Sequence, residues 1–172
     1  MPSKTQIPDS WIKKLAAIRL VVMDVDGVLS DGRIIYDSKG IEYKSFDAHD
    51  GYGIYRAKTN GLKLAIISGR KSNVVTIRAK ALGIHEVHQG NIDKVSVFKK
   101  IEKKLKLKDH QCCFIGDDEF DLPLLNIVGF SAAPSDAMEE VLNSVDYVTA
   151  KKGGRGAVRE VLDLILLSQN RL

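Results

Sequence analysis

Short apolar runs alternate with amphipathic segments along most of the chain. Six runs have the length of buried strands, at residues 18–25, 61–68, 85–89, 111–116, 129–134 and 145–150; the first is rich in β-branched residues and the third is weaker. Helical periodicity and helix-ending Gly or Asn residues predict helices within 50–60, 71–83, 91–107, 121–127, 135–144 and 153–169. Strands that alternate with helices pair in parallel through right-handed crossovers. The pattern therefore predicts an α/β fold, a Rossmann-like three-layer sandwich around a mainly parallel sheet.

One segment interrupts this alternation. Residues 33–46 contain two β-rich arms around the turn-forming sequence Asp-Ser-Lys-Gly, which predicts a β-hairpin inserted after the first strand. Only this hairpin and one helix fit between the first two strands, so we expect no separate cap domain. We expect residues 1–172 to form a single domain, which is an ordinary length for one hydrophobic core. A short helix is expected within 8–18, and residues 1–18 are assigned no catalytic role.

Composition excludes several classes of protein. The net charge is +4, but the densest lysines, within 99–110, alternate with apolar residues as on the wet face of a helix rather than in a nucleic-acid footprint. No apolar run approaches the ~18 residues of a membrane span, and no secretory cleavage pattern follows the N-terminus. Adjacent Cys112 and Cys113 are predicted to pack in the core, which fits a reducing compartment. We expect a cytoplasmic protein that binds neither nucleic acid nor membrane.

Polar and charged residues collect where the predicted strands end. They are Asp24 and Asp26 after the first strand, Ser68, Gly69 and Arg70 after the second, Lys94 at the start of the helix that follows the third, and Asp117, Asp118 and Asp121 after the fourth. The carboxyl ends of parallel strands share one edge of the sheet, where ligands bind. Carboxylates gathered there repel one another and need a cation. Oxygen ligands without His or Cys favour a hard ion, so the sequence predicts Mg²⁺.

This set of side chains is suited to phosphoryl transfer. Beside a metal ion, one aspartate can stay ionised as a nucleophile while another is protonated as a general acid. The Ser68 hydroxyl and the Lys94 ammonium can hold phosphoryl oxygens and offset their charge.

The stretches DVDGVLSDG, SGRK and GDDEFD, together with Lys94, resemble the four ordered motifs of the haloacid dehalogenase-like phosphohydrolases. The resemblance implies that Asp24 attacks phosphorus and that Asp26 acts as general acid and then general base. It implies that Ser68 and Lys94 bind the phosphoryl group. It also implies a Mg²⁺ ion held by Asp24, the main-chain carbonyl of Asp26, and Asp117, with support from Asp118 and Asp121.

A narrower resemblance covers nearly the whole chain, including KSFDAHDGYGI, HQGNIDK and VDYVTAKKGGRGAVREV. It is to small capless phosphatases of lipopolysaccharide sugar synthesis, whose substrate is an eight-carbon 2-keto-3-deoxy sugar acid phosphate. The resemblance implies a homotetramer in which the hairpins form a central barrel and sites lie at subunit interfaces. Arg70 and Arg155 suit a substrate bearing both phosphate and carboxylate. Sister enzymes for nine-carbon acids tend to carry Glu at the position of Arg70, and that substrate class stays open.

Two other classes of function remain as alternatives. A phospho-signalling receiver also uses an acidic pair, a Ser or Thr and a Lys, but it needs an aspartate at the end of a middle strand, where this chain has Ser68. A non-catalytic regulatory or oligomerisation module would not need every catalytic position to be present. Individual residues also have structural interpretations: Asp50 is expected either to line the mouth of the site or to cap the helix that follows, and Asp121 either to cap a helix or to order the metal loop.

Overall fold

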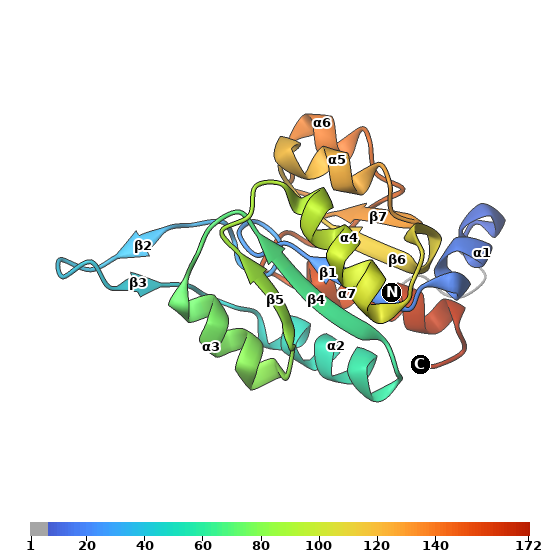
Figure 1. Ribbon diagram of the computed structural model, residues 1–172, viewed down its shortest axis with the longest axis horizontal. Coiled ribbons are helices and arrows are strands. Elements are labelled where there is room, and N and C mark those ends of the chain that lie inside the picture. Colours follow the sequence, from blue (N-terminus) through green and yellow to red (C-terminus); the bar gives the residue numbers. More distant parts are fainter. Residues whose placement is uncertain (1–6) are drawn as a thin grey trace.

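The computed structural model describes residues 7–172 and contains a six-stranded sheet flanked by helices (Figure 1). The strand order is β5-β4-β1-β6-β7-β8, and every neighbouring pair is parallel. The strands are β1 Leu20–Met23, β4 Lys63–Ser68, β5 Glu86–Gln89, β6 Cys112–Ile115, β7 Phe130–Ala133 and β8 Tyr147–Val148. All six lie within predicted runs, and the predicted fold class is confirmed.

Helices cover both faces of this sheet. They are α1 Asp9–Ala17, α2 Ala48–Thr59, α3 Asn73–Leu82, α4 Lys94–Leu105, α5 Leu122–Leu125, α6 Glu139–Leu142 and α7 Ala157–Ser168. Val21 and Met23 of β1 point into the core shared with α1, α2, α3 and α7, whereas Leu20 and Val22 point into the core shared with α4, α5 and α6. Because both faces are covered, β1 reads as a continuous apolar run. Full burial of each such side chain stabilises the fold by roughly 1.5–3 kcal/mol.

Two helices are shorter than predicted. The segments 121–127 and 135–144 form only the one-turn helices α5 and α6, whereas α7 begins at Ala157, directly after the glycine-rich turn expected there. The backbone of Met138 is extended, and its N–H donates to the Asp117 carbonyl at 2.9 Å instead of continuing a helix. Gly154 and Gly156 have positive φ values, which a helix does not allow.

The turn before α7 packs against the loop that follows β1. A Cβ on Gly153 would lie 1.7 Å from the Gly27 carbonyl oxygen, and the Gly154 N–H donates to the Val28 carbonyl at 2.9 Å. Gly153 and Gly154 are therefore required because the backbone of this turn lies directly against the backbone of the loop after β1. The last helix of the chain is in this way joined to the loop that carries the first acidic motif.

Asp50 anchors the start of α7. Its buried carboxylate accepts hydrogen bonds from the backbone N–H groups of Arg159 at 2.7 Å and Gly156 at 3.3 Å. Burial raises the pKa of Asp50 to about 6. The helix that contains Asp50 is capped instead by Asp47, which accepts from the His49 N–H at 2.6 Å. The predicted capping role of Asp50 is therefore wrong, because α2 begins two residues earlier than its periodicity indicates.

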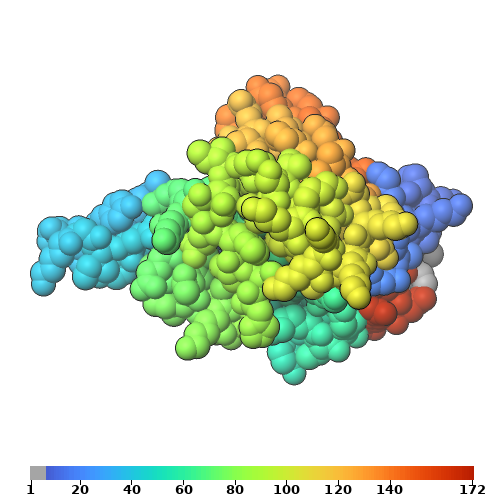
Figure 2. Space-filling model, in the orientation of Figure 1, coloured from blue at the N-terminus to red at the C-terminus, as the bar shows by residue number. Residues whose placement is uncertain are grey.

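The predicted hairpin is confirmed as β2 Ile35–Tyr36 and β3 Glu42–Tyr43, and it projects from the body as an arm (Figure 2). The apolar side chains are exposed, namely Ile34, Ile35, Tyr36, Ile41 and Tyr43. By contrast, Lys44 places its charged side chain in the interior, where it is 1% exposed. That residues 1–172 act as one domain stays a prediction.

No helix within residues 7–172 combines the length and the apolar character needed to cross a membrane.

Candidate active site

Three aspartates meet at the carboxyl edge of the sheet. Asp24 follows β1, Asp117 follows β6, and Asp121 ends the 3-10 helix Glu119–Asp121. One carboxylate oxygen from each lies within 4.8 Å of those from the other two. The structure thus brings together two segments that were predicted to lie at strand ends on one edge of the sheet.

Lys94 is the cation inside this cluster. It is the first residue of α4 and is buried, with its ammonium 3.1 Å from Asp24 Oδ1 and 2.5 Å from Asp121 Oδ1. The ammonium also lies 4.5 Å from the ring centre of Phe120 and 5.6 Å from that of Phe114. One positive charge therefore faces three carboxylates.

The electrostatics of the cluster fit a divalent cation. Burial raises the pKa of Asp117 to about 8; Asp24 and Asp121 add to the rise, and Lys94 opposes it. Burial likewise raises the pKa of Asp24, although Lys94 lowers it. Asp117 Oδ1 is buried without a hydrogen-bond partner among residues 7–172, and the Oδ1 atoms of Asp24 and Asp121 share the one ammonium of Lys94. Such oxygens are costly to bury unless a cation is bound, and an all-oxygen donor set suits Mg²⁺.

Glycines allow the acidic loops to approach this closely. Gly27 has φ +87°, and a Cβ there would lie 1.9 Å from Asp117 Oδ2. A Cβ on Gly116 would lie 2.7 Å from Asp121 Oδ2, which accepts hydrogen bonds from the N–H groups of Asp117 at 3.0 Å and Asp118 at 3.4 Å. Asp121 therefore orders the loop, as one interpretation expected. It also lies in the carboxylate cluster itself, beyond the supporting position predicted for it.

The side chains of Asp26 and Asp118 lie outside the cluster. The Asp26 carboxylate is 21% exposed, pairs with Lys44, and lies 3.4 Å from Arg70 Nη1 and 3.3 Å from Ser30 Oγ. Asp118 caps the 3-10 helix by accepting from the Glu119 N–H at 2.7 Å. The metal role assigned to Asp26 concerns its main-chain carbonyl and stays a prediction.

The second motif lies at the end of β4, beside the first. Ser68 is buried, and a Cβ on Gly69 would lie 3.9 Å from the ring of Phe120. Arg70 donates to Glu42 at 3.0 Å and to the Tyr36 hydroxyl at 3.2 Å, in addition to its contact with Asp26. The hairpin arms are therefore tied to the second motif.

Arg155 occupies a different position. Its guanidinium is 66% exposed and lies 3.8 Å from Asp31, in the loop that follows the first motif. Arg155 lies there because it belongs to the glycine-rich turn before α7, which packs against this loop.

Sequence reasoning missed Glu42 and Lys44. Glu42 lies 3.5 Å from the Lys44 ammonium, and it accepts from the Ser72 hydroxyl, which holds the pKa of Glu42 below its ordinary value. A signal was present, since Glu42 and Lys44 alternate with apolar Ile41 and Tyr43 and so share one face of the strand.

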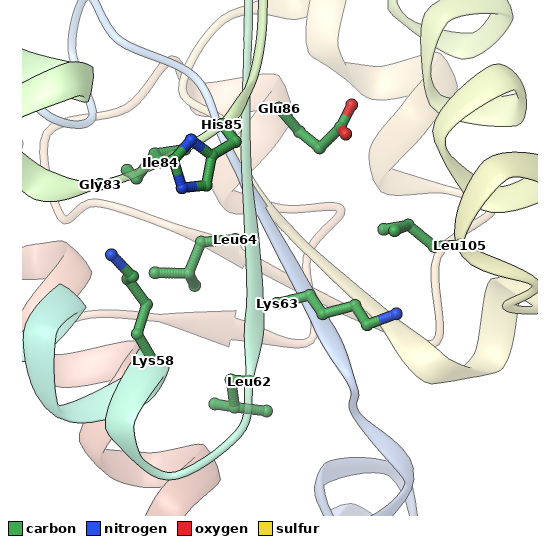
Figure 3. A pocket seen from close by; sticks show the side chains of 9 residues that line it. All are labelled: Lys58, Leu62, Lys63, Leu64, Gly83, Ile84, His85, Glu86 and Leu105. Atoms are coloured by element: carbon green, nitrogen blue, oxygen red, sulfur yellow. The ribbon is translucent and has the colours of Figure 1, made fainter.

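A pocket at the opposite end of the sheet is not part of this site (Figure 3). It lies at the amino ends of β4 and β5, and its lining includes Lys58, Lys63, His85 and Glu86. Lys58 already donates to the Leu82 carbonyl at 2.8 Å, and Glu86 pairs with Lys104. Ligands of open parallel sheets bind at the other edge, where the carboxylates are.

Comparison with known proteins agrees with this geometry. A family model described as haloacid dehalogenase-like hydrolase matches residues 71–162. The 3-deoxy-D-manno-octulosonate 8-phosphate phosphatase KdsC of Yersinia pestis is 45% identical over 166 residues, covering 96% of this chain and 89% of that protein.

Solved structures are similar over the same extent. The crystal structure of the Yersinia pestis phosphatase superposes with a TM-score of 0.95 at 44% identity, covering 96% of this chain and 90% of that one. The corresponding phosphatase of Moraxella catarrhalis, solved with a magnesium ion, a phosphate ion and a KDO molecule, gives a TM-score of 0.93 at 44% identity, with 95% and 94% covered.

Proposed function

This chain belongs to the haloacid dehalogenase-like hydrolases, and from that premise we propose that it is a Mg²⁺-dependent phosphatase that converts 3-deoxy-D-manno-octulosonate 8-phosphate to the free sugar acid and phosphate. In this function it serves lipopolysaccharide sugar synthesis. The observation that carries the proposal is the set of Asp24, Asp117 and Asp121 around Lys94, in which one ammonium faces three carboxylates and Asp117 Oδ1 has no hydrogen-bond partner within the described chain. The named relatives support the choice of substrate.

Asp24, Asp117 and the main-chain carbonyl of Asp26 would hold Mg²⁺, with Asp121 beside them. The ion would supply positive charge that keeps Asp24 ionised and offsets the charge of the phosphate.

The chain's own residues then divide the reaction into two steps. An Asp24 carboxylate oxygen forms a bond to phosphorus while the bond from phosphorus to the sugar oxygen breaks, and Asp26 gives its proton to that oxygen. In the second step a water oxygen attacks phosphorus, Asp26 takes a proton from the water, and the bond to Asp24 breaks. Ser68 and Lys94 bind the phosphoryl oxygens throughout, and Asp118 supports the metal loop.

Arg70 and Arg155 are proposed to recognise the sugar acid. Both are partly exposed, at 36% and 66%. A guanidinium can hold a carboxylate bidentately, and the substrate carries one besides its phosphate. Arg70 stands where Glu is common in phosphatases of nine-carbon acids, which favours the eight-carbon substrate.

A substrate panel tests the function. Phosphate release is measured from the eight-carbon acid phosphate, a nine-carbon acid phosphate and a neutral hexose phosphate. We expect the highest kcat/KM with the eight-carbon acid, loss of activity in EDTA, and recovery when Mg²⁺ is added, because the carboxylate cluster needs a cation. Release that does not depend on a metal would contradict the proposed site. Phosphorylation without turnover would indicate a receiver, and no reaction at all would indicate a regulatory module.

We further propose a homotetramer held together by the hairpins, with sites at subunit interfaces. The support is the exposed apolar side of the hairpin, where Ile35 and Tyr43 pair and are 48% and 53% exposed. Exposed apolar patches and strand edges mark association surfaces.

Two hairpin variants test the assembly. Deletion of residues 34–46 and the double substitution Ile35→Ser with Tyr43→Ser are both expected to give monomers in analytical ultracentrifugation, because each removes the apolar contact. The double substitution keeps Lys44, so its activity reports only the contribution of neighbouring subunits. A tetramer from the deletion would contradict the assembly, and a fully active monomer from the double substitution would contradict shared sites.

We propose a cytoplasmic location. Cys112 and Cys113 are free and buried, and burial raises the pKa of Cys112 to about 12, so this thiol stays protonated and packs as an apolar group.

A further inference from the structure

Lys44 is a buried lysine that reaches the site from the inserted hairpin. Its side chain is 1% exposed, and its ammonium contacts the Asp26 carboxylate and lies 3.5 Å from Glu42. Burial of an ammonium is costly unless it is paired and hydrogen-bonded. A hairpin that served only to join subunits would not need such a residue at its base.

The neighbours of Lys44 hold it toward Asp26. Glu42 accepts from the Ser72 hydroxyl and from Arg70 at 3.0 Å, so the hairpin arm is bound to the segment between β4 and α3. Lys44 and Arg70 each contact the carboxyl groups of both Asp26 and Glu42. These mutual contacts fix where the Lys44 ammonium lies.

Of the two cations that contact the Asp26 carboxylate, Lys44 is the buried one, with a side chain 1% exposed against 36% for Arg70. The contacts of Asp26 to Arg70 at 3.4 Å and to Ser30 at 3.3 Å are long for charge-assisted hydrogen bonds. Without Lys44, Asp26 would keep only these weaker contacts and could rotate away from the sheet edge.

We infer that Lys44 is a positioning residue for Asp26, which it holds where the carboxyl group can protonate the departing sugar oxygen. This inference rests on the proposed function. It gives the hairpin a part in the chemistry of its own subunit, separate from any role in assembly.

The leaving group distinguishes this role from a structural one. A sugar oxygen needs a proton as it departs, whereas p-nitrophenolate leaves without one. The ratio of kcat/KM for the two substrates therefore reports proton donation, since kcat/KM covers only the steps up to loss of the leaving group. A positioned acid contributes ~10²–10⁴-fold, so Lys44→Met is expected to lower kcat/KM for the sugar acid phosphate by about 10–100-fold. The loss with p-nitrophenyl phosphate is expected to stay below about threefold.

Three further variants complete the experiment. Lys39→Met, an exposed lysine of the same hairpin, is the matched control and should leave both values unchanged. Lys44→Arg keeps the charge and should recover part of the loss. In an Asp26→Asn background, Lys44→Met should cause no additional loss with the sugar substrate, because the two residues act as a unit.

Equal losses with both substrates, or none with either, would overturn the inference, as would full additivity with Asp26→Asn. If Lys44→Met does not fold, judged by its thermal melt, Lys44→Arg and Glu42→Gln provide the same comparison. If the wild-type protein hydrolyses p-nitrophenyl phosphate but no sugar acid phosphate, the proposed substrate is wrong. The test of Lys44 then uses an alkyl phosphate that the wild-type protein does hydrolyse in place of the sugar acid phosphate.

Discussion

Asp24→Asn is expected to abolish turnover, with phosphate release falling by at least about 10⁴-fold, because an amide oxygen is a poor nucleophile toward phosphorus. The fold should be retained, since Asn has nearly the same size. Asp24 is buried beside two other carboxylates, and burial raises its pKa, so removal of its charge does not destabilise the cluster. Activity is measured with a saturating concentration of the sugar acid phosphate, and thermal melting reports the fold.

Asp9→Asn is the matched control for this substitution. Asp9 is an exposed carboxylate in the first turn of α1, so the same chemical change there should leave phosphate release unchanged. Normal activity in Asp24→Asn would refute the nucleophile assignment. Failure of both variants would point to an effect of preparation rather than of the site.

Gly27→Ala is expected to reduce kcat/KM by about 100-fold or more, since ångström-scale displacement of a catalytic group can have an effect of that size. The added Cβ would lie 1.9 Å from Asp117 Oδ2, so the Asp117 carboxylate must move out of the cluster. The concentration of Mg²⁺ needed for half-maximal activity should rise as well. The positive φ of Gly27 adds strain of roughly 1–2 kcal/mol, which lowers the thermal midpoint.

Gly40→Ala separates strain from displacement. Gly40 has φ +78° at the hairpin tip, and a Cβ there would meet no atom within 4 Å. Its backbone strain is therefore similar, while the carboxylate cluster is untouched. If the two variants required the same Mg²⁺ concentration, displacement of Asp117 would not be the cause.

The convergence of Asp24 and Asp117 could be predicted from the sequence because it depends only on topology. Both follow β-rich apolar runs, and parallel strands present their carboxyl ends at one edge. The inward position of the Lys44 side chain is harder to predict from the sequence. Its face of the hairpin is fixed by Glu42, Ser72 and Asp26, residues that the period-2 pattern alone does not connect.

Tertiary contacts also explain the errors in the helices. The periodicity of 135–144 predicts a longer helix than α6, but the Met138 N–H instead bonds to the Asp117 carbonyl. Asp50 resembles a local cap, yet its partners are the distant N–H groups of Gly156 and Arg159. Local sequence signals cannot reveal a partner that far along the chain.

The attachment of the turn before α7 to the loop after β1 has a consequence for synthesis on the ribosome. A nascent chain of 150 residues already contains Asp24, Asp117 and Asp121. It still lacks Gly153 and Gly154, against which the loop carrying Gly27 packs, and the apolar residues of α7 that fill one side of the sheet. Catalytic competence should therefore arise late in translation, only after the final helix has emerged and docked.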